Sequence, residues 1–237
     1  MTLEGKTVLI TGAKRGIGRA LVDEALARGA DRVYAATRKP STHADPRVQP
    51  VTIDLTDADS TRAAAADIEV LDVLVNNAGI AGYDDLSDAA VLQQHLAVNL
   101  IGTLEVTQAF LPALMRSEGS VVNLTSTAGV APLPFIPSYS ISKAALLSLT
   151  QALRALFAPR GVRVHAVIAG PVDTQMSKDF KVPKASAGSV AAAIFDGVAN
   201  GVEEIFPDPV AQQLTEAWTN GASKVLERSY ADLAPAS

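Results

Sequence analysis

The chain has 237 residues, of which 48% are hydrophobic and 19% are charged, and its formal net charge is −5. This composition excludes a disordered protein, and an acidic chain without a basic run is not typical of proteins dedicated to nucleic acids or anionic membranes. The absence of cysteine excludes disulfide frameworks, thiol catalysis and cysteine-ligated metal sites, and we expect no metal. The sequence shows no secretory signal and no run of ~18 apolar residues, so we expect a cytoplasmic protein without a membrane partner.

Short apolar runs rich in β-branched residues predict strands over 7–10, 31–36, 51–53, 71–75, 120–124 and 162–168. Stretches with helical spacing of small and apolar residues predict helices over 17–28, 91–115 and 138–157. Strands that are apolar on both faces and alternate with helices are typical of an α/β fold with a doubly wound parallel sheet and helices on both faces. We expect a single domain over 1–237, with a lid over about 171–189, where the sequence is least regular.

A glycine-rich turn follows the first predicted strand and precedes the first predicted helix. Its glycines, Gly12, Gly16 and Gly18, have the spacing G-x-x-x-G-x-G. Glycines allow a tight turn and let a phosphate approach bare backbone, while the helix N-terminus offers free N–H groups and a positive dipole end. The turn therefore predicts a dinucleotide site, and the alternative is a glycine-rich turn without a ligand.

The end of the second predicted strand indicates which dinucleotide fits. An acid there would bind the adenosine ribose, but this strand ends in Ala36-Thr37-Arg38-Lys39 without one. Arg38, together with Arg15 in the glycine turn, would suit the 2′-phosphate, because guanidinium groups match phosphate geometry. The pair favours NADP(H), with solvated surface charge as the alternative.

Two further strand ends carry weaker signals. The small residues of Asn76-Asn77-Ala78-Gly79 would leave room for the adenine-side ribose, although the same residues also describe an ordinary turn. Asp54-Leu55 follows the third predicted strand, and the alternative there is a helix N-cap region before Thr56-Asp57.

Tyr139 and Lys143 lie four residues apart on a predicted helix, which places both side chains on one face. A nearby ammonium lowers the pKa of a phenol, and such a phenol can exchange a proton with a carbonyl or alcohol oxygen. Ser126, at the end of a predicted strand, could hold that oxygen beside Tyr139. The alternatives are a surface Tyr–Lys pair and loop or cap chemistry for Ser126. Asn99 is a polar residue in an apolar helix, and its alternative is a local irregularity satisfied by water.

In this order, the motifs resemble those of the short-chain dehydrogenase/reductase family over about residues 5–206. The matching segments are 11–18, 76–79, Asn99, Ser126 and 139–143. The resemblance implies a Rossmann-like domain and hydride transfer between a nicotinamide and a carbonyl or alcohol carbon. It implies that Tyr139 is the general acid in reduction, that Lys143 binds the nicotinamide ribose and lowers the pKa of Tyr139, that Ser126 orients the substrate oxygen, and that Asn99 holds a water in a proton relay.

The segment Ala169–Thr174 resembles the family segment that cradles the nicotinamide carboxamide, with Ala169 where a proline is frequent. Cofactor contacts are expected from Gly12, Lys14, Arg15, Gly16, Ile17, Gly18, Thr37, Arg38, Asp54, Leu55, Asn77, Ala78, Gly79, Tyr139, Lys143, Gly170, Pro171, Val172 and Thr174. The chain departs from the family after residues 203–208, where a helical stretch continues to Arg228. The resemblance favours a homodimer or homotetramer, and we expect contacts through the helices predicted over 91–115 and 138–157.

The apolar run 131–137 lies between Ser126 and Tyr139 and either packs as a rigid loop or lines the substrate site. In the second case the small-molecule substrate is an apolar ketone or aldehyde. We expect the chain to be an NADPH-dependent carbonyl reductase. The alternatives are a non-catalytic NADP(H)-binding sensor or regulatory protein, which would need none of this proton chemistry, and a dehalogenase or dehydratase, which would have no use for the phosphate-binding glycines.

Overall fold

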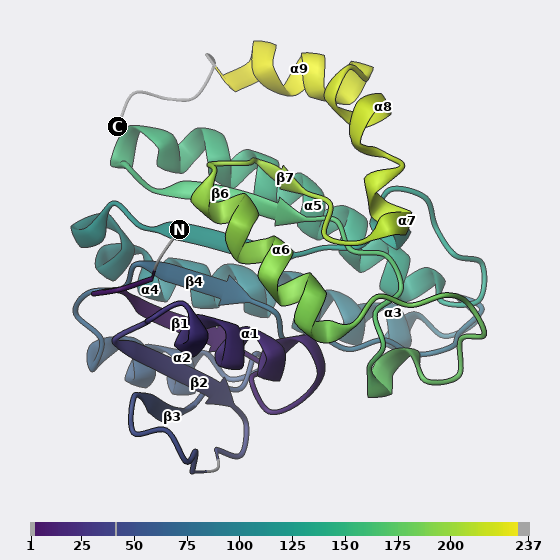
Figure 1. The fold of residues 1–237 in the computed structure, drawn as a ribbon. Coiled ribbons are helices and arrows are strands. Elements are labelled where there is room, and N and C mark those ends of the chain that lie inside the picture. The colour runs from purple at the N-terminus through teal and green to yellow at the C-terminus, as the bar shows by residue number, and fades with distance from the viewer. Residues whose placement is uncertain (1–2, 41, 232–237) are drawn as a thin grey trace.

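The computed structural model describes residues 3–40 and 42–231, so both ends of the expected domain lie outside the described residues. Its centre is one parallel sheet of seven strands in the order β3-β2-β1-β4-β5-β6-β7 (Figure 1). The strands are β1 (Thr7–Thr11), β2 (Arg32–Thr37), β3 (Val48–Thr52), β4 (Val73–Asn76), β5 (Ser120–Leu124), β6 (Arg163–Val167) and β7 (Glu204–Ile205). The order reverses between β1 and β4, which confirms the predicted doubly wound, Rossmann-like fold.

Helices cover both faces of this sheet (Figure 1). One face packs against α1 (Gly16–Ala27) and α6 (Ala187–Ala199). The other packs against α2 (Ala58–Ala66), α4 (Thr103–Ser117) and α5 (Pro137–Phe157). The remaining helices are α3 (Ala89–Leu96), α7 (Pro209–Gln212), α8 (Thr215–Thr219) and α9 (Ala222–Ala231).

The apolar strand runs explain this layering. Val8 and Ile10 of β1 pack with the α1–α6 layer, Leu9 packs with the opposite layer, and all three are fully buried. Successive side chains on a strand point to opposite faces, so a strand covered on both faces needs an unbroken apolar run. The edge strand β3 is the exception, because it contains exposed residues and Pro50, whose missing N–H is tolerated at an edge.

The helix expected over 91–115 is not continuous. It divides into α3, a π-helical segment (Ala97–Gly102) and α4. A Cβ atom at Gly102 would overlap the backbone oxygen of Leu55 and lie 2.7 Å from its Cβ atom. The helix therefore bulges where its backbone approaches the loop after β3, and π-helical segments of this kind are frequent at functional sites.

By length and composition alone, one helical stretch of the described part of the chain, Ala89–Ser117, is apolar enough to cross a membrane. Phe110 and Leu114 in this stretch are fully buried in the cluster that includes β1, β4 and β5. Its apolar character is thus explained by its place as a core helix against the sheet.

A buried polar ladder crosses the middle of the sheet. Asn76 and Asn123 are register partners on β4 and β5, and the Asn76 Nδ2 donates to Asn123 Oδ1 at 2.9 Å. The same Nδ2 lies 2.9 Å from Thr107 Oγ1 of α4, and Asn123 Nδ2 donates to Thr150 Oγ1 of α5 at 3.0 Å. The ladder therefore joins two strands to the two helices that cover them.

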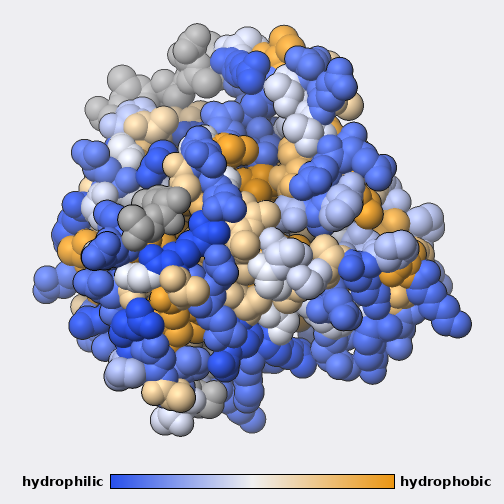
Figure 2. Space-filling model, in the orientation of Figure 1, coloured by the Kyte–Doolittle hydropathy of each residue, from blue (hydrophilic) through white to orange (hydrophobic). Residues whose placement is uncertain are grey.

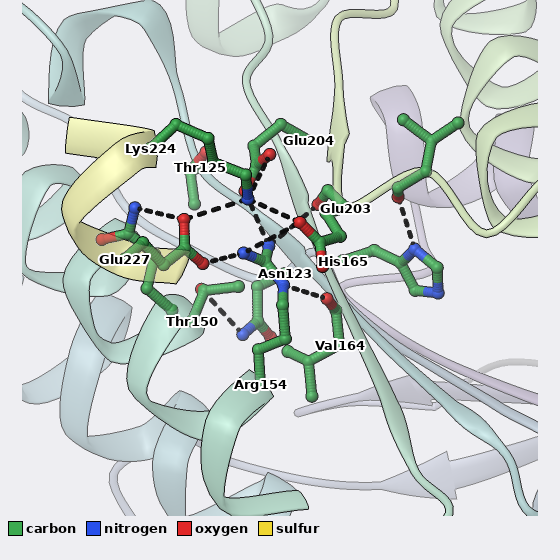
Figure 3. Close-up of polar contacts among 12 residues, drawn as sticks. Asn123, Thr125, Thr150, Arg154, Val164, His165, Glu203, Glu204, Lys224 and Glu227 are labelled. Carbon is green, nitrogen blue, oxygen red and sulfur yellow. Dashed lines mark hydrogen bonds and ion pairs between the residues drawn. The ribbon is translucent and has the colours of Figure 1, made fainter. Parts of the chain in front are cut away.

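After β7 the chain forms α7, α8 and α9, as expected for a helical C-terminal stretch. A cluster of charged side chains attaches α9 to the rest of the molecule (Figure 3). Lys224 of α9 is almost fully buried, and its Nζ lies 2.6 Å from Glu203, 2.9 Å from Glu204 and 3.0 Å from Glu227. Arg154 of α5 pairs with Glu204 at 2.8 Å and also with Glu227.

The side of the surface seen in Figure 2 is mostly hydrophilic, with small separated apolar patches.

Candidate active site

The expected site residues gather at the carboxyl ends of β1, β4, β5 and β6, where the strand order reverses. The glycine turn between β1 and α1 is tight. Gly12 and Gly16 have positive φ angles of 66° and 56°, and a Cβ atom at Gly12 would lie 2.9 Å from the Cα of Ala78. A Cβ at Gly18 would overlap the carbonyl oxygen of Gly12. The sequence therefore needs glycine at these positions for the backbone to turn directly into α1.

The N-terminus of α1 is open to an anion. Its N-cap residue, Arg15, provides no side-chain cap, and the first turn contains no acidic residue. Lys14 and Arg15 are exposed beside it, while Ile17 packs against the core. Uncapped N–H groups with two adjacent cations are suited to bind a phosphate.

The adenosine end of the expected site lies at the end of β2. The Thr37 hydroxyl is buried, and among the described residues it has no hydrogen-bond partner. Arg38 is exposed, and its charge helps to lower the pKa of Asp54, although hydrogen bonds from Thr56 lower it more. Arg38 and Asp54 are thus close enough to interact, whereas Leu55 is buried against the π-helical segment. Asp57, not Asp54, is the N-cap of α2.

Asn77 fastens the glycine turn to β4. Its Nδ2 donates to Thr11 O at 2.8 Å and to Gly12 O at 3.3 Å. The backbone N–H groups of Asn77 and Ala78 both donate to Thr11 Oγ1 at 3.0 Å. A Cβ at Gly79 would lie 3.0 Å from Asn99 Oδ1 and 3.8 Å from Lys143 Nζ. This segment therefore connects the glycine turn with the residues expected to be catalytic.

Ser126, Tyr139 and Lys143 come together from β5 and α5. The half-buried Tyr139 lies close enough to Ser126 for the serine to influence its pKa, and Ser126 Oγ donates to Ala169 O at 3.3 Å. Lys143 is 5% exposed, and its Nζ lies 5.7 Å from the centroid of the Tyr139 ring. The same Nζ donates to Leu124 O at 2.6 Å. A hydroxyl, a phenol and a cation thus share one site at the end of β5.

The segment after β6, residues 170–174, lies next to the glycine turn. The Gly170 N–H donates to Asp208 Oδ2 at 2.7 Å, and Val172 is buried. A Cβ at Gly16 would lie 3.1 Å from Thr174 Cγ2, so Thr174 lies directly beside the start of α1. Segments more than 150 residues apart in sequence therefore meet where a cofactor would lie.

Comparison with known proteins agrees with this geometry. The family model described as short chain dehydrogenase matches residues 6–184. The chain belongs to the short-chain dehydrogenase/reductase family.

Relatives of this oxidoreductase family resemble the chain over most of its length. Galactitol 2-dehydrogenase (L-tagatose-forming) from Cereibacter sphaeroides is 39% identical over 74% of this chain and 74% of its own. A short-chain dehydrogenase from Burkholderia cenocepacia, solved in complex with NADP, has a TM-score of 0.88 at 34% identity and covers 96% of this chain and 98% of its own. NADPH-bound carbonyl reductase from chicken fatty liver has a TM-score of 0.75 at 28% identity, with coverages of 82% and 91%.

One expectation from the resemblance is wrong for the structure as it stands. The pKa of Tyr139 is raised, not lowered, because burial disfavours the phenolate, and the nearby Ser126 hydroxyl offsets this only in part. Lys143 does not lower this pKa; its Nζ lies 5.7 Å from the centroid of the Tyr139 ring and donates to Leu124 O. Burial also lowers the pKa of Lys143 itself, to about 8.

Asn99 has more partners than its sequence position indicated. It is fully buried in the π-helical segment, where its Oδ1 accepts from Ile80 N at 2.8 Å. Its Nδ2 donates to Ile80 O and to Ser142 Oγ, both at 2.9 Å. The helix irregularity named as the alternative therefore exists, but protein groups and not water satisfy the side chain. The role of Asn99 in a water relay stays a prediction.

Sequence reasoning missed Asp84, which caps α5 from 54 residues away. The N-cap position of α5, Ile136, provides no cap. Instead, the Ser138 N–H donates to Asp84 Oδ1 at 3.3 Å, and the Ser138 hydroxyl donates to Asp84 Oδ2. A cap from outside the helix leaves no local signal, and only the apolar residue at the N-cap position hints that one is needed.

Proposed function

We propose that the chain is an NADP(H)-dependent carbonyl reductase, which transfers a hydride between the nicotinamide and a carbonyl or alcohol carbon and reduces an apolar ketone or aldehyde. The observation that carries this proposal is the meeting of Ser126, Tyr139 and the buried Lys143 at the open end of the glycine turn. Burial lowers the pKa of Lys143, so keeping this ammonium in a buried site costs free energy. A non-catalytic NADP(H) sensor would have no need of it.

The residues present fit an NADP(H) cofactor. The glycine cradle that a Cβ would fill, the uncapped α1 N-terminus and the unpartnered Thr37 hydroxyl all suit the phosphates and the adenosine ribose. Lys14, Arg15 and Arg38 are exposed cations near those groups and favour the 2′-phosphate. The NADP and NADPH bound in the two similar structures support the same choice.

When bound, NADPH would supply the hydride to the carbonyl carbon. In reduction the carbonyl oxygen gains negative charge, and the Tyr139 hydroxyl donates the proton that completes the alcohol. A raised pKa suits this direction, because the phenol stays protonated at neutral pH. Ser126 would orient the carbonyl oxygen beside Tyr139, and Lys143 would hold the nicotinamide ribose. The remaining expected contacts, from Gly170, Pro171, Val172 and Thr174, would orient the nicotinamide.

The lid belongs to the same proposal. Its base is closed, because Asp173 N donates to Ala185 O at 2.8 Å and Ala185 N donates to Pro171 O at 3.0 Å. Since α6 begins at Ala187, the irregular part ends about three residues earlier than expected. We propose that this segment covers the nicotinamide and excludes water from it.

We also propose a cytoplasmic homodimer or homotetramer. The helices expected to form the contacts carry exposed apolar side chains, namely Ile101, Met115, Ile141 and Leu156. Such side chains on neighbouring helices support an interface between subunits.

The proposal is tested with Tyr139→Phe, which removes the donated proton and keeps the ring. Turnover of an accepted carbonyl should fall at least about a hundredfold, since a positioned acid contributes typically 10²–10⁴-fold. The cofactor Kd and the melting temperature should stay near those of the wild type. Tyr230→Phe, on the exposed face of α9, is the matched control and should keep full turnover. A folded, NADPH-saturated Tyr139→Phe enzyme with wild-type kcat would refute the proposed proton donor.

A further inference from the structure

Exposed apolar side chains concentrate around the proposed active site. Of the seventeen large apolar side chains that are exposed in the described part of the chain, seven lie in three loops at the carboxyl edge of the sheet. These loops are 77–88 after β4, 125–136 after β5 and 168–186 after β6. The seven residues are Tyr83, Leu86, Val130, Leu133, Phe135, Met176 and Val182. The apolar run 131–137 thus does not pack as a rigid buried loop, since only Ile136 is fully buried.

Three aromatic rings, one from each loop, form the centre of this apolar surface. We call Tyr83, Phe135 and Phe180 the aromatic triad. The ring centroids lie 5.9 Å apart for Tyr83 and Phe135, 6.2 Å for Tyr83 and Phe180, and 5.6 Å for Phe135 and Phe180. Phe180 meets both partners edge-on, at interplanar angles of 80° and 77°. Tyr83 is 65% exposed and Phe135 43%, so ring surface remains open to a ligand.

The triad is fixed to the proposed catalytic helix. Asp84, next to Tyr83, accepts hydrogen bonds from the backbone N–H and the hydroxyl of Ser138, and Ser138 precedes Tyr139. Asp84 N also donates to Phe135 O at 3.4 Å. Two members of the triad are therefore held at the start of α5, within one helical turn of the proposed proton donor.

The third member belongs to the lid. Phe180 N donates to Ser177 O at 3.0 Å, and Ser177 in turn bonds to the Val172 and Thr174 carbonyls. Thr174 lies beside the glycine turn. Phe180 thus connects the lid segment to the two rings held at the start of α5.

We propose that the aromatic triad determines substrate specificity by binding an aryl ring at the non-reacting end of the carbonyl substrate. The inference rests on the proposed function and names the substrate class more narrowly, as aryl ketones and aldehydes. Aromatic rings attract one another through edge-to-face and offset contacts that a saturated ring cannot reproduce, and the triad presents such edges and faces. A substrate aryl group that packs against Phe180 would also hold the lid segment over its own carbonyl.

The experiment compares acetophenone with cyclohexyl methyl ketone, which have the same carbon skeleton and differ in the aromaticity of the ring. Two quantities are measured: kcat/KM with NADPH, and the Kd of each ketone by ligand-observed NMR with enzyme and NADP⁺, which cannot donate a hydride. The variants are Phe135→Leu and Phe180→Leu, with Tyr230→Leu on α9 as a control. The preference for acetophenone should fall roughly 3- to 10-fold in each triad variant, the range expected for an aromatic pair. The cofactor Kd should not change.

The possible outcomes separate the two proposals. An unchanged preference in both triad variants, or no binding of either ketone to the NADP⁺ complex, would overturn the role of the triad. If neither ketone is turned over but binding still depends on Phe135 and Phe180, the triad stands and the reductase proposal fails. An equal loss of preference in Tyr230→Leu would also contradict the triad, because that residue lies outside it.

Discussion

Lys143 is a buried cation whose only described hydrogen bond is to a backbone carbonyl. Burial lowers its pKa from an ordinary value of 10.5 to about 8. Between these values the unfolded chain binds a proton that the folded protein has released, so the free energy of unfolding rises with pH through this window. The positive charge of Lys143, which the proposed chemistry needs, therefore lowers the free energy of unfolding of the cofactor-free protein at neutral pH.

Lys143→Met should remove this dependence. From about pH 7 to about pH 9.5, wild-type protein without cofactor should gain roughly 2 kcal/mol in the free energy of unfolding relative to Lys143→Met, since each pH unit above the pKa contributes about 1.4 kcal/mol. Urea unfolding at several pH values measures it. Lys39→Met, at an exposed lysine, should keep the wild-type slope. Parallel curves for wild type and Lys143→Met would show that Lys143 is not a destabilising buried charge.

The residues of the candidate site were predictable, but their electrostatics were not. The four-residue spacing of Tyr139 and Lys143 places both side chains on one helix face, and the accompanying Ser126 singled the pair out from an ordinary surface pair. The same spacing predicted that Lys143 would lower the pKa of Tyr139, whereas burial of the phenol raises it. Asp84 and the aromatic triad were missed because their partners lie on other loops, at sequence distances that no local pattern reports.

Among the elements, the strands were easiest to predict: six of the seven overlap predicted segments, and β1, β2 and β4 each contain an unbroken run of apolar residues. Two helices were missed. α2 has nine residues with no large apolar side chain and therefore little periodic signal. α6 begins inside the polar stretch expected as a lid. The interruption of the helix at 97–102 was also unpredictable as a π-helical segment, because it depends on Leu55 and Ile80 in distant loops.

Gly102 is the position where this segment permits no side chain. Gly102→Ala should lower the free energy of unfolding by about 1–3 kcal/mol, the usual cost of overpacking, because its Cβ would overlap the Leu55 backbone. Gly188→Ala is the matched control in α6, since no atom lies within 4 Å of its added Cβ. That variant should be neutral or stabilising by up to about 1 kcal/mol, from helix propensity alone. Thermal and urea unfolding compare the two, and equal stabilities would contradict the close approach.

At the scale of the whole molecule, the charged cluster of Arg154, Lys224, Glu203, Glu204 and Glu227 attaches the C-terminal helix (Figure 3). Burial opposes the charge on Lys224, but its hydrogen bonds to the three glutamates raise its pKa above 10.5. Burial likewise opposes the charge on Glu203, but Lys224 and Arg154 lower its pKa. The contribution of Glu203 is therefore lost as pH falls through its lowered pKa, and that of Lys224 as pH rises through its raised pKa.

Lys224→Met should be strongly destabilising, by about 3 kcal/mol or more, because it leaves the buried Glu204 and the half-buried Glu227 without one of their two cations. The double variant Lys224→Met/Glu227→Gln should lose less than the sum of the two single variants, since it removes one unpaired charge. A double-mutant cycle by urea unfolding measures the coupling. Additive losses would mean that the cluster does not act as a unit.

The paired amides of Asn76 and Asn123 also have a consequence for how the sheet assembles. The apolar residues 73–75 of β4 and 121–122 of β5 contain little information about strand alignment, since a slipped pairing would still bury hydrocarbon. If β4 and β5 paired one residue out of register, the two amides would be separated within the core. Each would then lose the hydrogen bond that now joins them, which costs free energy. The Asn76–Asn123 pair therefore favours one register of β4 against β5 over the alternative registers. Asn77 and Ser126 follow these two strands, so the register also sets their positions relative to each other. Asn76 and Asn123 thus help to position site residues without contacting a ligand themselves.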